Sequence, residues 1–131
     1  MCIRDRFAPQ CLIDDNIRSF CDQRRMTMLP YTPLLRGAYV RSDRPLAASY
    51  RSGDSDVRLE VLHQVAGECG ATANQVVLAW MMQRQPLMIP VFSASRVDHM
   101  RENLAAAELT LTPDQLNRLT LAGDVPNEEP N

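Results

Sequence analysis

The stretch Gln75-Val-Val-Leu-Ala-Trp80, continued by Ile89-Pro90, Ser93-Ala-Ser-Arg96 and Glu102-Asn103, decides the fold of this chain. Its pattern predicts a buried helix, a short apolar strand, a turn of small residues and a second helix. A small-residue turn between a parallel strand and a helix N-terminus favours phosphate, because unpaired backbone N–H groups and the helix dipole both attract an anion. In a (β/α)8 barrel this site lies in the loops after the last two strands. The stretch therefore predicts the closing part of a cofactor-binding barrel.

Composition limits the classes of function. The chain has 131 residues, 45% of them hydrophobic, and a net charge of −2. This length suits one domain, and the charge gives no basic field for nucleic acid. No apolar run approaches the ~20 residues of a membrane helix, and no secretory signal pattern opens the chain. We expect a cytoplasmic protein without nucleic-acid or membrane partners.

Two residue types restrict the chemistry. The spacing of the four cysteines (Cys2, Cys11, Cys21 and Cys69) contains no Cys-x-x-Cys pair and fits no zinc template, so we expect reduced thiols and no metal site. All 14 basic residues are arginine, so any mechanism that needs a lysine must find it outside this chain.

The periodicity of apolar residues predicts an alternation of helices and short strands. Five helices are expected. The first two lie at 14–24, with Ile13, Ile17, Phe20 and Cys21 on one face, and at 57–69. The other three begin with capping boxes: Thr72 with Gln75, up to the residues before Pro86; Ser95 with Asp98, up to about 107; and Thr112 with Gln115, up to Gly123. Two buried strands are expected at 26–31 and 87–92, with a loop at 36–56 between the first strand and the second helix. Residues 1–6 resemble a translated sequencing adapter, with a native N-terminus as the alternative, and 124–131 read as a loose polar tail.

This order predicts an α/β fold with parallel strands and crossover helices. Two strands alone cannot close a sheet, and each would expose an unpaired edge. We therefore expect residues 7–123 to be the C-terminal part of a (β/α)8 TIM barrel, with about two parallel strands, flanking helices and an extra C-terminal helix. A self-contained small α/β domain without catalytic function is the alternative.

Five short motifs in order carry a family resemblance. They are Tyr31-Thr-Pro-Leu-Leu35, Asn74-Gln-Val-Val-Leu-Ala-Trp80, Ile89-Pro90 with Ser93-Ala-Ser95, Glu102-Asn-Leu-Ala-Ala106, and Leu111-Thr-Pro-Asp-Gln-Leu116. Together they resemble the C-terminal half of aldo-keto reductases. The resemblance implies NADPH-dependent reduction of an aldehyde or ketone by an Asp, Tyr, Lys and His tetrad. The chain has no lysine, and its tyrosines match positions outside the tetrad, so we expect no catalytic residue here and no turnover by this chain alone.

The resemblance implies that this part of the barrel holds the cofactor. Tyr31 would stack on the nicotinamide ring, and Thr32, Pro33 and Leu34 would lie along the ribose and pyrophosphate. The turn formed by Ser93, Ala94, Ser95 and Arg96 would hold the 2′-phosphate, although the family usually has glycine where Ser93 stands. His99 could reach the phosphate or the adenine, and Glu102 and Asn103 match the pair that contacts the adenine amine.

Plainer interpretations stay open for these residues. Tyr31 could be a core tyrosine, Thr32 to Leu34 a plain turn, and Glu102 and Asn103 a solvated helix face. Arg41 and Arg44 could close over the pyrophosphate but are better explained as solvated loop residues. Trp80 is expected in the core, and His63 and His99 could be exposed without a role. For the whole protein, a redox-sensing regulatory subunit of the same fold is the alternative to an enzyme; the carbonyl substrate and the oligomeric state are open.

Overall fold

The computed structural model describes residues 15–46 and 53–122. Its helices, in chain order, are α1 (Asp15–Gln23), the 3-10 turn η1 (Leu35–Gly37), α2 (Gly53–Cys69), α3 (Ala73–Met82), α4 (Val97–Leu104), the 3-10 turn η3 (Ala105–Ala107) and α5 (Pro113–Leu121). The predicted leader 1–6 and tail 124–131 lie outside the described residues.

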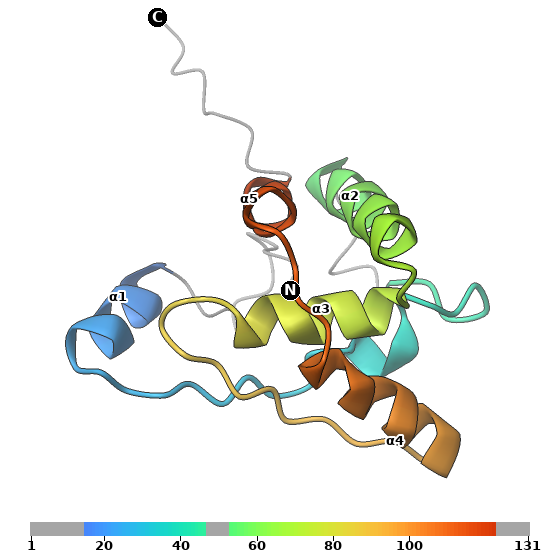
Figure 1. Cartoon of the computed structure of the whole chain (residues 1–131), viewed down its shortest axis with the longest axis horizontal. Helices are drawn as coiled ribbons and strands as arrows, with labels where there is room; N and C mark the ends of the chain where they lie inside the picture. The colour runs from blue at the N-terminus through green and yellow to red at the C-terminus, as the bar shows by residue number, and fades with distance from the viewer. Residues whose placement is uncertain (1–14, 47–52, 123–131) are drawn as a thin grey trace, which may run out of the picture.

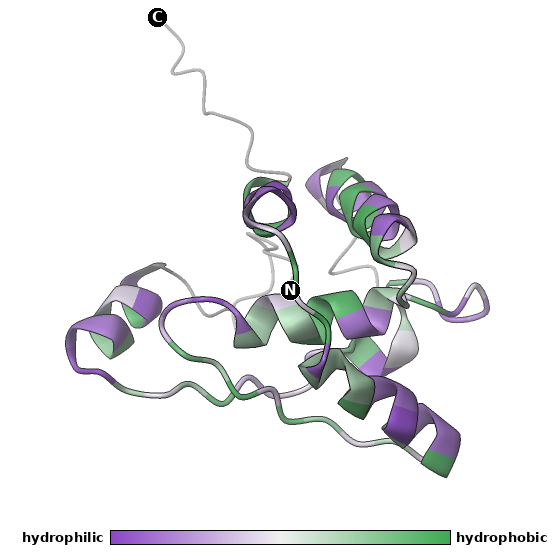
Figure 2. Cartoon of the chain, viewed as in Figure 1, coloured by the Kyte–Doolittle hydropathy of each residue, from purple (hydrophilic) through white to green (hydrophobic). Residues whose placement is uncertain are grey.

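Helix α3 is the centre of the molecule, with α2 and α5 on one side and α4 on the other (Figure 1). Figure 2 shows α3 coloured hydrophobic along most of its length, whereas α4 is largely hydrophilic. Eight of the ten residues of α3 are buried. A helix that is apolar on all sides needs neighbours on all sides, and α3 therefore organises the packing of the other elements.

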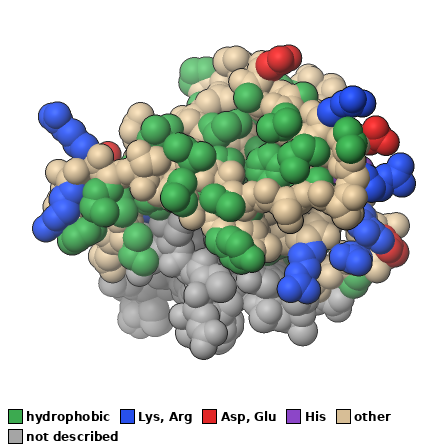
Figure 3. Space-filling view, turned by 90° about the horizontal axis from the view of Figure 1, so that it is seen from below, with side chains coloured by type: hydrophobic (Ala, Val, Ile, Leu, Met, Phe, Trp, Pro, Cys, Tyr) green, Lys and Arg blue, Asp and Glu red, His purple; other side chains and the backbone are tan. Residues whose placement is uncertain are grey.

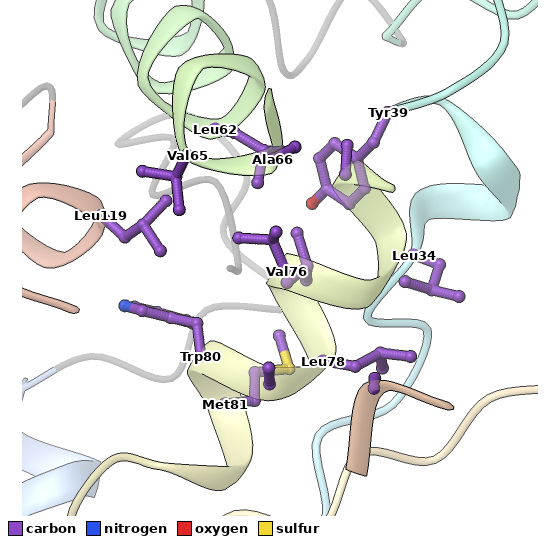
Figure 4. Packing of buried hydrophobic residues seen from close by; sticks show 14 of the residues in the cluster. Leu34, Tyr39, Leu62, Val65, Ala66, Val76, Leu78, Trp80, Met81 and Leu119 are labelled. Atoms are coloured by element: carbon purple, nitrogen blue, oxygen red, sulfur yellow. The ribbon is translucent and has the colours of Figure 1, made fainter. Parts of the chain in front are cut away.

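The two faces of α3 enter different parts of the core. Val76 and Trp80 point toward α2 and α5, where they meet Leu62, Val65 and Leu119 (Figure 4). On the opposite side, Leu78 approaches Leu34, which follows the first extended segment. Leu62 and Val65 are fully buried. The expectation that Trp80 belongs to the core is confirmed by its 7% exposure.

The predicted helix ends are confirmed where local capping chemistry sets them. Thr72 and Thr112 each form a capping box with the glutamine three residues later, which satisfies backbone donors at the starts of α3 and α5. Gly70 ends α2 with a φ of +60°, a conformation that glycine adopts without steric cost. The prediction for the start of α2 was four residues late, because Gly53 to Asp56 lack apolar periodicity although two aspartates favour the first turn.

The prediction of two continuous strands at 26–31 and 87–92 is wrong. The residues form two extended segments that run in parallel, joined by isolated bridges between Met28 and Met88 and between Tyr31 and Val91, and no strand is assigned in the described part of the chain. The N–H of Met28 donates to the carbonyl of Leu87 at 2.9 Å. Further along, the N–H of Val91 donates to the carbonyl of Pro30 at 2.9 Å. Pro30 has no N–H for the reciprocal bond, so the ladder is interrupted.

The register of this pairing separates two faces. Met28 and Met88 lie opposite each other and are 6% and 4% exposed, as part of the core cluster. The neighbouring positions alternate to the other face, where Leu29, Ile89 and Tyr31 are 64%, 51% and 85% exposed. Figure 3, seen from below, shows hydrophobic side chains gathered on this side of the molecule. The pairing is thus buried on one face and bare and apolar on the other.

Helix α1 confirms the helix predicted at 14–24. Ile17 and Phe20, which lie on its apolar face, are 47% and 50% exposed. The guanidinium of Arg24 lies 3.8 Å from the centre of the Phe20 ring, a cation–π contact that covers part of this apolar surface.

Candidate functional site

The parallel pairing brings the two predicted cofactor segments together. Tyr31 pairs with Val91, so 31–34 and 93–96 both leave the paired region at the same end, toward which both segments run. Ligand sites of open α/β folds lie at this carboxyl end of parallel strands. The sequence predicted both segments, and the structure makes them neighbours.

The first segment exposes an aromatic ring beside a sharp turn. Tyr31 is 85% exposed in this chain, so it is not part of the core that the described residues form. Thr32 has a φ of +57°, in the left-handed region that non-glycine residues rarely occupy. Pro33 and Leu34 are buried, and Leu34 belongs to the core cluster. Any contact of Leu34 with a cofactor would therefore come from its backbone.

The second segment leads directly into the N-terminus of α4. Ser93, Ser95 and Arg96 are exposed and Ala94 is half-buried. The prediction that Ser95 caps this helix with Asp98 is wrong: Arg96 is the N-cap, and its side chain makes no capping hydrogen bond. The Arg96 guanidinium instead lies 3.5 Å from the Asp98 carboxylate. Unlike α3 and α5, helix α4 starts without a side-chain acceptor for its first N–H groups.

The C-terminal end of α4 carries the predicted adenine pair. Glu102 is half-buried, and Asn103 is the one buried residue of α4, at 6% exposure, so a fully solvated helix face does not describe this pair. The side-chain amide of Gln75 donates to the backbone carbonyl of Glu102 at 2.9 Å. This contact connects the start of α3 to the last turn of α4. His99, near the other end of α4, is exposed.

Arginines gather near α4 and the loop after η1, at one edge of the face in Figure 3. Arg41 donates from Nε to the Asp43 carboxylate at 2.9 Å, and Arg44 is exposed. The hydrogen bond from Arg41 holds the pKa of the Asp43 carboxyl below its usual value and raises the pKa of Arg41. Arg41 is thus held by its own loop, as expected for a solvated loop residue.

The histidine on α2 and the cysteines do not form a second candidate site in the described residues. His63 is exposed on α2, as expected. Cys21 and Cys69 are free thiols, and the described residues contain no cluster of three or more His, Cys, Asp or Glu that could hold a metal ion. Among the helices of 15–46 and 53–122, none is both long and apolar enough to cross a membrane.

Sequence reasoning missed the connecting role of two glutamines, Gln75 in the first turn of α3 and Gln83 directly after its last residue. Gln75 was identified as a capping residue only, and Gln83 was not identified at all. The Gln83 amide donates to the carbonyl of Leu109 at 2.7 Å and accepts from the N–H of Leu111 at 3.0 Å. Gln83 is exposed, so no local signal in the sequence shows that its amide bonds to the backbone after η3.

Comparison with known proteins identifies the family. The model of the aldo/keto reductase family matches residues 7–123. An uncharacterized oxidoreductase of Schizosaccharomyces pombe is 26% identical over 110 residues, which cover 84% of this chain and 31% of the relative. An aryl-alcohol dehydrogenase [NADP(+)] of Phanerodontia chrysosporium is 26% identical over 124 residues, which cover 82% of this chain and 32% of that protein.

A solved structure agrees with these relatives. A thermostable aldo-keto reductase in complex with the inhibitor epalrestat superposes with a TM-score of 0.62 at 29% identity. The match covers 82% of this chain and 34% of that one. The chain belongs to the aldo-keto reductase family, whose members are oxidoreductases, and it spans about a third of the length of the relatives that it matches.

Proposed function

We propose that this chain forms the cofactor-binding part of a cytoplasmic NADPH-dependent aldo-keto reductase, built on strands seven and eight of the barrel. The whole protein would transfer hydride to an aldehyde or ketone. The observation that carries the proposal is the parallel pairing of Tyr31 with Val91, because the exposed Tyr31 and the 93–96 segment that leads into the uncapped start of α4 then lie at the same end of the paired region.

The fit to a dinucleotide phosphate rests on the chemistry of this turn. The first N–H groups of an α-helix lack helical acceptors, and the dipole adds partial positive charge there. The Arg96 side chain leaves them uncapped and is itself exposed, so it can add a charge-assisted hydrogen bond to a phosphate oxygen. A relative named for NADP(+) supports the choice of the phosphorylated cofactor.

Each end of the cofactor would meet a different part of the chain. The Tyr31 ring offers a flat surface for stacking at low cost in side-chain entropy. Ser93, Ala94, Ser95, Arg96 and His99 would hold the 2′-phosphate, and Glu102 and Asn103 would face the adenine. The nicotinamide supplies the hydride when the cofactor is bound. This chain contributes no tetrad lysine, so its residues bind and orient the cofactor rather than deliver the proton.

The test is to titrate the full chain with NADPH and, separately, with NADH, and to measure the two affinities by isothermal titration calorimetry. We expect tighter binding of NADPH, and we expect the Arg96→Ala variant to reduce that preference. Arg101→Ala is the matched control, because Arg101 is an exposed arginine in the last turn of the same helix. Equal affinity for the two cofactors would contradict the NADPH preference, and binding of neither would overturn the proposal.

A further inference from the structure

We propose that Gln75 is a positioning residue for the adenosine end of the cofactor, because its side chain ties the start of α3 to the last turn of α4. This inference rests on the proposed function, which assigns Glu102 and Asn103 to the adenine. Gln75 itself would touch no part of the cofactor.

The capping box fixes the orientation of the Gln75 amide. Its oxygen accepts from the backbone N–H of Thr72 at 2.9 Å, and its nitrogen donates to the carbonyl of Glu102 at 2.9 Å. Thr72 offers a donor and Glu102 an acceptor, so both contacts select the same orientation of the amide. The hydrogen bond of the Gln75 amide oxygen within the capping box therefore also directs the amide N–H toward α4.

Helix α4 depends on such contacts more than its neighbours do. It has eight residues, and its one buried side chain is the polar Asn103. Without an apolar face in the core, little hydrophobic energy fixes its position. The carbonyl of Glu102 lies in the last turn, where helix carbonyls lack regular N–H donors. The bond from Gln75 satisfies this carbonyl and anchors the turn that carries both proposed adenine residues.

Gln83 provides a matched control at the other end of α3. Its amide bonds to the backbone at Leu109 and Leu111 just as the Gln75 amide bonds to the backbone at Thr72 and Glu102, with one donated and one accepted hydrogen bond. The Gln83 contacts hold the connection between η3 and α5, away from the residues assigned to the cofactor. A general loss of stability should therefore follow either change, and only the Gln75 change should alter adenosine binding.

The test compares Gln75→Glu with Gln83→Glu in the full chain. Glutamate keeps the acceptor for Thr72 and remains a capping-box residue, but it removes the donor to Glu102. We expect Gln75→Glu to raise the Kd for adenosine 2′,5′-bisphosphate about tenfold, the effect of one lost hydrogen bond. We expect Gln83→Glu to change this Kd less than about twofold, and neither variant to change the Kd for pyrophosphate, measured by NMR titration.

Pyrophosphate separates positioning from charge and from stability. If the new carboxylate merely repelled anions, or if the fold were loosened, pyrophosphate binding would weaken by the same factor as bisphosphate binding. That result would overturn the inference. Equal weakening of bisphosphate binding by the two variants would overturn it as well. Bisphosphate binding that Gln75→Glu leaves unchanged contradicts this inference alone, whereas a wild-type chain that binds no adenosine probe contradicts the proposed function.

A measurement on the unmodified chain does not depend on the folding of any variant. The side-chain amide resonance of Gln75 should shift when adenosine 2′,5′-bisphosphate binds, because its acceptor belongs to the turn that meets the adenine. The Gln83 amide resonance should not shift, and pyrophosphate should shift neither. A Gln75 resonance that stays in place on binding of the bisphosphate would overturn the inference.

Discussion

Arg58 is a charged residue of α2, and the spacing of apolar residues in this helix does not predict that it is buried. Its side chain is nevertheless only 6% exposed. Its Nε donates to the carbonyl of Ala122 at 2.7 Å, so a residue of α2 holds the end of α5 across 64 positions of sequence. A buried charge needs such partners. The periodicity of apolar residues predicts apolar core positions. It cannot predict a buried arginine whose hydrogen-bond acceptor is a backbone carbonyl 64 positions away.

Replacing Arg58 with methionine keeps most of the side-chain volume and removes the donor. We expect a loss of about 1.5–3 kcal/mol in the free energy of unfolding, because a hydrogen bond from a charged group is broken and a carbonyl is left unpaired. Urea unfolding followed by circular dichroism measures this change. The exposed Arg101→Met is the control and should change stability by less than about 0.5 kcal/mol; equal effects of the two variants would contradict the role given to Arg58.

At the scale of elements, the sequence was most informative where an element is defined by its own residues. The capping boxes at Thr72 and Thr112 were predicted with the correct partners, because cap and acceptor lie three positions apart. The start of α4 was misplaced by one residue, since Ser95 has a capping side chain and Arg96, the observed cap, does not. The strands became isolated bridges because Pro30 lacks the donor that a continuous ladder needs.

The capping box of α5 allows a direct test. Oγ1 of Thr112 accepts from the N–H of Gln115 at 3.2 Å. We expect Thr112→Ala to cost about 1 kcal/mol of stability, as is usual for loss of a threonine cap. Thr110→Ala is the control, because Thr110 is exposed and lies outside both neighbouring helices. Thermal unfolding of both variants measures the difference, and a control as destabilised as Thr112→Ala would argue against the cap.

The contact between α2 and α5 should depend on pH. Hydrogen bonds from Gln115, at 3.0 Å, and from Arg118, at 2.7 Å, lower the pKa of Glu68 below its usual value near 4.5. A lowered carboxyl pKa means that the stabilisation is present above the unfolded-state pKa and is lost as pH falls through the lowered folded-state pKa.

We therefore expect the unfolding temperature of the wild type to fall between pH 6 and pH 3 by more than that of Glu68→Gln. The difference should be small and should shrink in high salt, because the Arg118 and Glu68 side chains are 32% and 42% exposed. Parallel pH profiles of the wild type and Glu68→Gln would show that the ion pair does not contribute to stability.

At the scale of the whole molecule, the bare apolar face governs behaviour in solution. Leu29, Tyr31 and Ile89 are each more than half exposed on one side of the paired segments, and residues 26–35 and 86–95 contain no charge. Uncharged, apolar sheet-like edges promote association between copies. The parallel order of the two segments was predictable from the alternation of apolar runs and helices, but no local signal shows which face of a two-segment pairing is left exposed.

We expect the chain alone to associate at micromolar concentration and to bind a hydrophobic dye. Leu29→Lys places a charge on the exposed face and should shift the chain toward the monomer, as measured by light scattering after gel filtration. Leu104→Lys adds the same charge at a leucine that is 59% exposed but belongs to α4 rather than to the paired segments, and should not do so. A wild-type chain that stays monomeric and binds no dye would contradict this account.

The register of the paired segments also makes their two outer borders unequal. In parallel pairing, successive residues direct their backbone groups alternately to either side. The backbone groups of Met28 face the other segment, so those of Leu29 and Tyr31 face outward and make no hydrogen bond to another described residue. On the far segment Pro90 faces outward and has no N–H. Addition of a further strand should therefore be favoured at the border that carries Leu29 over the border that carries Pro90, where one donor is missing.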